Sequence, residues 1–453
     1  MNVNSLKVRE LLDLKRWSIV CFASAVVACF AVSPMALGFF GITYDSAGGA
    51  AWQKLHPATY LIALAITLGL LGRDNRVAYL RKVLAKLPGV AFFVAIWILL
   101  TVYAALVRHS PITSLLETFL IAVTALVMYD ELPQRVQSGL RLFLHVFLSV
   151  NALVGLGEHL THMRVFPYVI GGEEVTGDHR STALMGHPLQ NAATSAAYLL
   201  CLFLGGDAAL APMTRLALIL VQIIGLACFG GRTAIVASAL IIGANLLKDF
   251  VFVLLGARFD MRRVLALTIG APLVLAAVFY VALAGTFDDT AARFIEDNGS
   301  AEARVIMWRL FDSFALPDLL IGPDPEAVNT RLVDLGIGIG IENTWISLIF
   351  QYGVLMTLFF VAGLLALFWE FWRRSREGAF QLFLFFLALI SSAIGLAAKT
   401  MIFNHFALLL LLVFSERQEE AAPARRGASA AGAPFRSLPR ADSGRRRANW
   451  RSC

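Results

Sequence analysis

The sequence predicts an all-α polytopic membrane protein: a transmembrane helical bundle of about twelve spans, with two larger loops on its outer face. Two observations predict this class. Of the 453 residues, 58% are hydrophobic and only 15% are charged, and the mean hydropathy is +0.72, whereas a soluble domain carries about 25% charged residues. The apolar residues also form blocks long enough to cross a hydrocarbon core, which takes about 20 helical residues.

Twelve apolar blocks are the expected spans, and they also set the domain boundaries. The blocks lie at 18–40, 57–72, 88–107, 114–129, 142–160, 189–205, 215–230, 233–256, 264–285, 343–369, 380–398 and 401–415. We expect an N-terminal segment at 1–17, spans one to five within 18–160, a loop at 161–188, spans six to nine within 189–285, a larger loop at 286–342, spans ten to twelve within 343–415, and a basic, disordered tail at 416–453.

The positions of the basic residues predict the orientation. If the N-terminus is cytoplasmic and the spans alternate, most of the 38 Lys and Arg fall on the cytoplasmic side, as the positive-inside tendency requires. Both termini are then cytoplasmic, and the loops 161–188 and 286–342 face outward. The tail contains the run Arg445, Arg446 and Arg447. A polybasic segment beside a span indicates contact with anionic lipid, and no base-reading motif favours nucleic acid as a partner.

Several kinds of site find no support in the residue pattern. The five cysteines form no CxxC pair, and no zinc, Walker or Ser-His-Asp motif is present, so we expect no metal and no cofactor. The first apolar block is too long for a signal peptide and is expected to remain as a span. Ionisable groups inside the spans are scarce, chiefly Glu117 and Glu158. Ion-coupled carriers usually hold such groups near mid-membrane, so their scarcity counts against a flippase or other transporter.

The loop 286–342 is expected to contain a surface helix. Ser300 can cap a helix from Ala301 to Phe314 whose apolar face would include Trp308 and Phe311. Such a helix would lie flat on the membrane, with its Trp at headgroup level.

Ten basic residues fall on the outer side, against the general tendency: Lys54, Arg108, Arg164, Arg180, Arg232, Arg293, Arg304, Arg309, Arg331 and Lys399. Three of them have distinctive settings. Arg180 precedes span six, Arg232 lies in the tight turn between spans seven and eight, and Arg304 lies one helical turn before Trp308. Guanidinium groups bind phosphate bidentately, so we favour a shared anion-binding site. The alternative is that each Arg reaches individually toward lipid headgroups.

His187 and Glu342 are the main candidate proton acceptors on the same side, with His179 and His405 as weaker candidates. Glu342 and Asn343 open span ten. A carboxylate at a helix N-terminus is stabilised by the helix dipole, so a helix-start role is the alternative to catalysis for Glu342. His187 could equally be an interfacial histidine with no catalytic role.

The order of these motifs resembles the O-antigen ligase and Wzy-type polymerase superfamily of bacterial surface-polysaccharide enzymes, especially the VpsF-type polysaccharide biosynthesis membrane proteins. The resemblance covers the order of the spans over most of the chain. Three stretches carry it: Arg180 to Asn191 with Gly186-His187-Pro188 inside, then Gly231-Arg232-Thr233-Ala234, then Arg304 to Gly353 with Trp308, Gly322 and Glu342-Asn343 inside.

The resemblance implies a metal-independent glycosyltransferase at the periplasmic face of the bacterial inner membrane. Its donor would be an undecaprenyl-diphosphate-linked oligosaccharide, and a hydroxyl of a glycan acceptor would attack the anomeric carbon with inversion. Arg180, Arg232 and Arg304 would contact the diphosphate, and membrane lipids and other polysaccharide-synthesis proteins would be partners. Ligases usually have His immediately before the Asn343 equivalent, where this chain has Glu342. This difference favours a polymerase over a ligase, and a scaffold of a synthesis complex is the remaining non-enzymatic alternative.

Overall fold

The computed structural model describes residues 3–45, 48–170, 173–175, 178, 180–256, 306–336, 341, 343–392, 396 and 398–415. Helices dominate this part of the chain. In chain order, the elements are α1 (Val3–Ala31), α2 (Pro34–Phe39), η1 (Ala51–Lys54), α3 (Pro57–Leu71), α4 (Arg76–Lys86), α5 (Pro88–Leu106), α6 (Thr113–Tyr129), α7 (Gln134–Thr161), β1 (Val169–Ile170), β2 (Glu173–Glu174), α8 (Pro188–Phe203), α9 (Pro212–Phe229), α10 (Arg232–Leu254), η3 (Phe311–Ser313), α15 (Leu316–Ile321), α16 (Pro325–Asp334), α17 (Thr344–Trp372), α18 (Ala379–Ser392) and α19 (Ile402–Leu412).

Six described helices are long and apolar enough to cross a membrane, and they make this chain a helical membrane protein. They are Asp13–Ala31, Pro88–Leu106, Gln134–Thr161, Pro212–Phe229, Arg232–Phe252 and Thr344–Trp372. Four further apolar helices, α3, α6, α18 and α19, are shorter.

Local sequence signals explain where these helices begin. A proline occupies the first turn of α3, α5, α8 and α9, where its missing N–H costs nothing. Eleven of the twelve expected blocks coincide with helices, and the block 264–285 lies outside the described residues. The first block differs from expectation because the helix breaks after Ala31. Ser33 then caps the separate helix α2 by accepting a hydrogen bond from the Ala36 N–H.

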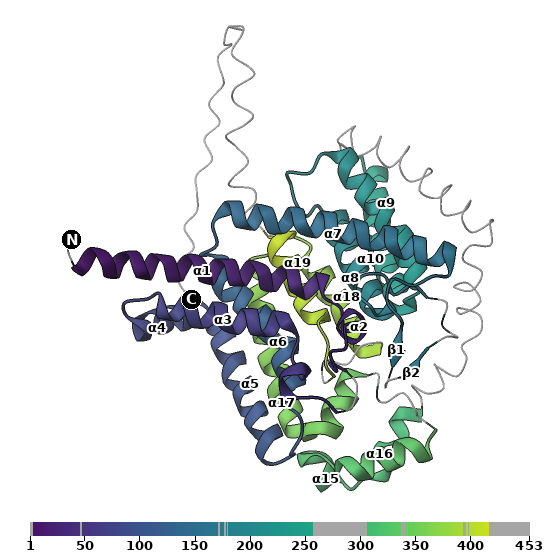
Figure 1. The fold of residues 1–453 in the computed structure, drawn as a ribbon. Helices are drawn as coiled ribbons and strands as arrows, with labels where there is room; N and C mark the ends of the chain where they lie inside the picture. Colours follow the sequence, from purple (N-terminus) through teal and green to yellow (C-terminus); the bar gives the residue numbers. More distant parts are fainter. Residues whose placement is uncertain are drawn as a thin grey trace, which may run out of the picture.

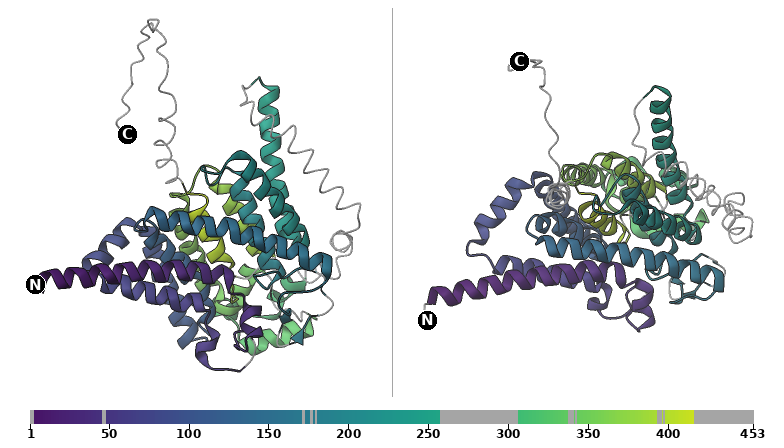
Figure 2. Two further views of the ribbon diagram at one scale, coloured as in Figure 1. Left: turned by 45° about the horizontal axis from the view of Figure 1, so that its top comes forward. Right: turned by 90° about the horizontal axis from the view of Figure 1, so that it is seen from above.

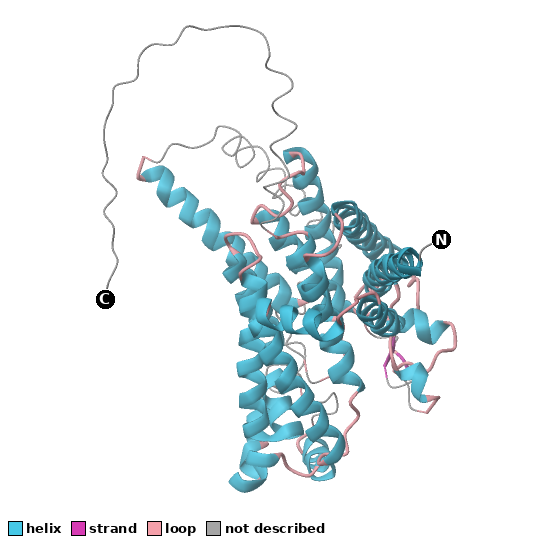
Figure 3. Cartoon of the chain, turned by 90° about the vertical axis from the view of Figure 1, so that its left-hand side faces the viewer, coloured by secondary structure: helices cyan, strands magenta, loops and turns pink. Residues whose placement is uncertain are grey.

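The helices lie in two groups that cross each other. In Figure 1, α1 and α7 run across the view, while α5 and α17 run down it. Figure 3 looks from the side on which α1 begins, so that α1 is seen nearly end-on beside helices that run vertically. Within the groups, α1 packs along α3, α5 along α17, and α9 against both α7 and α8.

The core lies around α8 and α19. Every residue of α19 is buried, as are nearly all residues of α8, and Figure 2 shows α19 enclosed by other helices when viewed from above. By contrast, α10 is only 6% buried over its apolar window, and its C-terminal half projects from the body (Figure 2).

A kink in α17 is held in place by an arginine. Gly353 has φ +84° inside this helix, and a Cβ there would come within 2.5 Å of the backbone of Ile321 and Leu320. Only glycine fits such a position without strain. Arg108 donates from Nε to the Gln351 carbonyl at 2.8 Å and from its terminal nitrogens to the carbonyls of Gly322 and Pro323. The guanidinium thus joins the kink to the segment after α15.

The expected surface helix ends earlier than predicted. Its described part is helical only up to Arg309 and continues as the 3₁₀ turn η3, so the helix does not reach Phe314. Met307 and Leu310 are the buried residues, and they pack with Phe350 of α17. Trp308 is 63% exposed and stacks on Phe311 at 5.8 Å between ring centroids. The expectation that Trp308 faces the membrane surface stays a prediction, and the face that packs on α17 is the neighbouring one of Met307 and Leu310.

Candidate functional site

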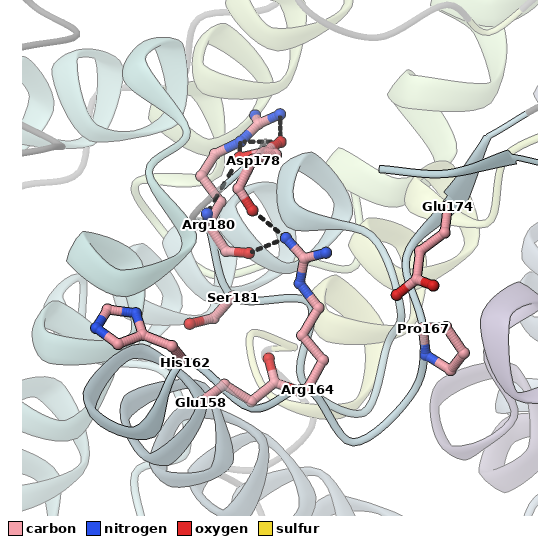
Figure 4. Close-up of a pocket in the computed structure, with 8 residues that line it drawn as sticks. All are labelled: Glu158, His162, Arg164, Pro167, Glu174, Asp178, Arg180 and Ser181. Atoms are coloured by element: carbon pink, nitrogen blue, oxygen red, sulfur yellow. Dashed lines mark hydrogen bonds and ion pairs between the residues drawn. The ribbon is translucent and has the colours of Figure 1, made fainter. Parts of the chain in front are cut away.

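A cavity of about 410 Å³ opens beside the segment that connects α7 and α8 (Figure 4). This segment forms a short antiparallel hairpin in which Val169 pairs with Glu174 and Ile170 with Glu173. The lining residues come from the C-terminal end of α7, the hairpin and the strand-like stretch before α8: Glu158, His162, Arg164, Pro167, Glu174, Asp178, Arg180 and Ser181.

Arg180 lines this cavity as a partner of Asp178. Its Nε lies 2.9 Å from both carboxylate oxygens of Asp178 (Figure 4), and the two side chains are only 18% and 13% exposed. Asp178 thereby neutralises the guanidinium and occupies its Nε and one terminal nitrogen. An anionic ligand that binds Arg180 has to share the guanidinium with Asp178 or displace it.

Arg164 is a second arginine of the cavity, but it binds backbone. Its terminal nitrogens donate to the carbonyls of Val175 at 2.9 Å, Asp178, and Arg180 at 3.5 Å, as Figure 4 shows in part. Arg164 therefore shapes the stretch that carries Arg180. This backbone contact is a structural role that the sequence did not reveal.

Glu158, near the end of α7, holds the same loop by accepting hydrogen bonds from its backbone N–H groups. One carboxylate oxygen accepts the N–H of Val165 at 2.8 Å, and the other accepts the N–H groups of Thr182 and Ala183, each at 2.8 Å. The side chain is 5% exposed. A buried carboxylate with three such donors is fully engaged, so Glu158 holds the loop and is no free base.

Two asparagines attach the same loop to the helices. The Nδ2 of Asn191, in α8, donates to the carbonyls of Thr182 at 2.5 Å and His187 at 3.1 Å. Asn151, in α7, donates to the Asn191 side chain at 2.8 Å and accepts the N–H of Leu184 at 3.0 Å. Both asparagines are completely buried. This network explains why an Asn follows the Arg180 stretch at this spacing.

His187 is the N-cap of α8. Its Nδ1 accepts the N–H of Leu189 at 3.2 Å, and its Nε2 lies 3.3 Å from the hydroxyl of Tyr168. Burial, and secondarily the positive charge of Arg180, lower the pKa of His187 to about 4. With Nδ1 engaged as an acceptor, the neutral ring carries its proton on Nε2. This geometry favours a capping role over the role of a general base.

Arg180 and Arg232 lie at the same end of α9. The N–H of Ser181 donates to the carbonyl of Cys228, in the last turn of α9, at 3.2 Å. The helix then ends at Gly230, which has φ +62°, and Arg232 begins α10 two residues later. Gly231 packs so closely on Ala192 of α8 that a Cβ would collide with it. The close approach of α8 therefore requires glycine at position 231, and this turn fixes the backbone of Arg232 at the start of α10.

Asn343 is linked to this region by hydrogen bonds that involve the last residues of α18. It caps α17 by accepting the N–H groups of Trp345 and Ile346, and its Nδ2 donates to the Ser391 carbonyl at 2.7 Å. The next residue, Ser392, donates to the hydroxyl of Thr233 at 3.2 Å, beside Arg232. Segments far apart in the sequence thus meet where α9 ends and where α10 and α17 begin.

Two of the predicted site residues, Glu342 and Arg304, lie outside the described residues. Trp308 belongs to a second apolar cluster at the start of α17. The structure therefore brings together Arg180, Arg232 and Asn343, with His187 capping the adjacent helix.

A buried polar group around Lys399 was missed by the sequence reasoning. The Lys399 ammonium lies 3.1 Å from the ring centroid of Tyr44, 3.7 Å from Asp45 and 3.9 Å from the fully buried Glu117. Tyr44 donates its hydroxyl to Glu117 at 2.6 Å. The Asp45 side chain is 51% exposed, whereas Glu117 is buried. These contacts give Lys399 structural partners.

Comparison with known proteins gave no match: no family model, no curated protein and no solved structure is similar to this chain.

Proposed function

We propose that this chain is a metal-independent glycosyltransferase that polymerises glycan repeat units carried on undecaprenyl diphosphate. It would have about twelve spans and cytoplasmic termini, and would work at the periplasmic face of the bacterial inner membrane. The observation that carries the proposal is the meeting of the Arg180, Arg232 and Asn343 segments at one end of α9, beside a cavity of about 410 Å³. These are three of the residues that match the superfamily pattern.

The chemistry would be electrostatic. A glycosyl diphosphate leaves as an anion, and guanidinium groups fixed near the departing oxygens lower the barrier most when they are positioned beforehand. Arg180 is positioned by Asp178, and Arg232 by the double-glycine turn. The acceptor hydroxyl must lose a proton as it attacks. Because the His187 nitrogens are already engaged, Glu342 remains the better candidate for the base.

Glycan sizing in a deletion strain tests the proposal and separates it from the ligase alternative. Loss of a polymerase leaves single repeat units on the lipid carrier. Loss of a ligase leaves long chains still attached to undecaprenyl diphosphate. Unchanged surface glycan in the deletion strain would contradict both readings.

Arginine variants then test the site. Arg180→Ala and Arg232→Ala should each lower the rate of chain extension about 10²- to 10³-fold, as expected when one pre-positioned charge donor is removed. The corresponding Arg→Lys variants should retain only part of the wild-type rate of chain extension, because lysine keeps the positive charge but lacks the planar fork of nitrogen donors. Arg331→Ala is the matched control: Arg331 is 54% exposed and pairs with Asp334 one turn away. Equal long-chain polymer in all three Ala variants would remove the arginines from the mechanism.

Glu342→Gln tests the base. The amide keeps the shape but cannot accept a proton, so extension should fall about 10²- to 10⁴-fold while donor binding persists. A carboxylate that only stabilises a helix start would cost about 0.3–1 kcal/mol of stability and leave activity near normal. Full polymer from Glu342→Gln would assign it that lesser role.

A further inference from the structure

A second and larger cavity, of about 630 Å³, lies between α1, α3, α4, α5 and α6. Its residues come from the ends of these helices that meet at α4, which lies beside α1 and α3 at the left of Figure 1. The cavity is distinct from the smaller one, since the two share no lining residue. Its volume falls within the range of about 300–1,000 Å³ that small-molecule sites occupy.

The walls of this cavity are mainly apolar, with the hydroxyls of Ser18 and Thr124 bonded to backbone carbonyls of their own surroundings. Side chains such as Ile66, Val94, Leu120 and Val127 line it, and Trp97 closes one part of it. An apolar cavity of this size binds a hydrocarbon chain through the burial of methylene groups.

The charged lining residues cluster beside the ends of α3 and α6, a region that we call the mouth of the cavity, and together they carry a net positive charge. Lys15, Arg73, Tyr79 and Glu131 stand there. Glu131 pairs with Arg73 and so balances one of the two positive charges, and the Arg73 guanidinium lies 4.1 Å from the ring centroid of Tyr79. The Nε of Arg73 is buried and has no hydrogen-bond partner among the described residues. An unsatisfied buried donor of this kind is costly and indicates a missing acceptor.

Helix α4 is amphipathic and lies beside the mouth, with one face lining the cavity. Tyr79, Leu80, Val83 and Leu84 line the cavity from one side of this helix. Leu80 and Leu84 are still 45% and 48% exposed, so the described protein leaves their apolar side chains partly uncovered. The helix also carries Arg76, Arg81, Lys82 and Lys86. An apolar face combined with basic residues is the pattern of a helix that lies among anionic headgroups.

We infer that this cavity binds an anionic phospholipid, with an acyl chain between α1, α5 and α6 and the phosphate at Lys15 and Arg73. The phosphate oxygens would accept the unsatisfied Nε–H of Arg73 and neutralise Lys15. The charge of the mouth selects an anionic headgroup over a zwitterionic one. The inference does not depend on the proposed glycosyltransferase activity.

Native mass spectrometry of the full-length protein in detergent tests this inference, with phosphatidylglycerol and phosphatidylcholine as probes. We expect one tightly held phosphatidylglycerol and weaker binding of phosphatidylcholine. Lys15→Gln should weaken phosphatidylglycerol about fivefold, the contribution of one basic residue near an anionic headgroup, and should leave phosphatidylcholine unchanged. Lys82→Gln is the matched control, since Lys82 belongs to the same basic surface but does not line the cavity.

A second set of variants tests the inference by filling the cavity with a larger side chain. Val127→Trp should reduce phosphatidylglycerol binding more than tenfold, because each methylene group excluded from an apolar site weakens binding about fourfold. Val102→Trp, at a position 47% exposed on α5, is the size-matched control. Three results would overturn the inference: equal binding of the two lipids, equal binding by the two Trp variants, or retention of a polyprenyl phosphate in place of phosphatidylglycerol.

Discussion

At the scale of single residues, charged side chains fix the backbone around the candidate site. Glu158 accepts three backbone N–H groups, Arg164 donates to backbone carbonyls on the opposite side, and Arg108 does the same at the kink of α17. Buried charges are tolerated when such bonds satisfy them. Arg180 differs because the partner of its guanidinium is a side chain, Asp178, whose carboxylate also accepts the Arg180 backbone N–H at 3.1 Å.

His187 makes the stability of the protein depend on pH. Its pKa is about 4 in the folded protein against 6.5 for the free group, so folding favours the neutral ring. The stabilisation is fully present above pH 6.5 and is lost as the pH falls through 4, and the shift corresponds to roughly 3 kcal/mol. Because asparagine is also a good N-cap, His187→Asn should keep the cap and remove this part of the pH dependence.

Thermal unfolding of both proteins between pH 7 and pH 4 measures the effect. The wild-type melting temperature should fall more steeply than that of His187→Asn, so the two curves should separate as the pH falls below 6.5. Parallel curves over the whole range would show that His187 titrates as it does in the unfolded chain.

At the scale of elements, the sequence predicted most helices but not their distortions. Proline at the first turn and apolar blocks of span length identify α3, α5, α8 and α9 directly. The break after Ala31 and the kink at Gly353 were not predicted. The break has a local signal, the capping Ser33 followed by Pro34, which the prediction overlooked. The kink at Gly353 instead depends on contacts with the distant α15, which no local pattern encodes. Arg108 and Lys399 were grouped with Arg180 and Arg232 because the distribution of basic residues predicts a side of the membrane but not the partner of each side chain.

Gly353→Ala tests the kink. The new Cβ would need φ +84° and would meet the backbone of Ile321 and Leu320 at 2.5 Å, neither of which can move as a side chain can. Strain of this kind costs about 1–3 kcal/mol, and the clash adds to it. Gly139→Ala in α7 is the control, because nothing lies within 4 Å of its Cβ and Ala is favoured in a helix by about 0.5–1 kcal/mol.

The two variants should therefore shift the midpoint of thermal unfolding in opposite directions. Gly353→Ala should also raise the protease sensitivity of the α15–α16 region, which packs on α17. A Gly353→Ala protein as stable as Gly139→Ala would mean that α17 runs straight through this position.

At the scale of the whole molecule, the arrangement of the helix ends bears on the orientation. The smaller cavity, the α9–α10 turn and the start of α17 belong to one set of helix ends. The basic helix α4 and the larger cavity belong to the other ends of α1, α3, α5 and α6. The candidate site for a lipid-linked glycan and the candidate site for an anionic phospholipid are thus served by different ends of the helices. This separation is what the positive-inside distribution predicts if α4 is cytoplasmic.

Reporter fusions test that orientation. Fusions after Asp178 and Asn329 should be active with a reporter that works outside the cytoplasm, and fusions after Met261 and Gly427 with one that works inside. The physical reason is the distribution of Lys and Arg, which holds only if the number of spans between these points is as proposed. One span more or fewer before Asp178 would move it, with Arg180 and the whole cavity wall, to the cytoplasmic side. An inward signal at Asp178 would therefore place the arginines on the cytoplasmic side, away from a donor at the outer face, and would contradict the proposed polymerase. The inferred phospholipid site does not depend on that activity.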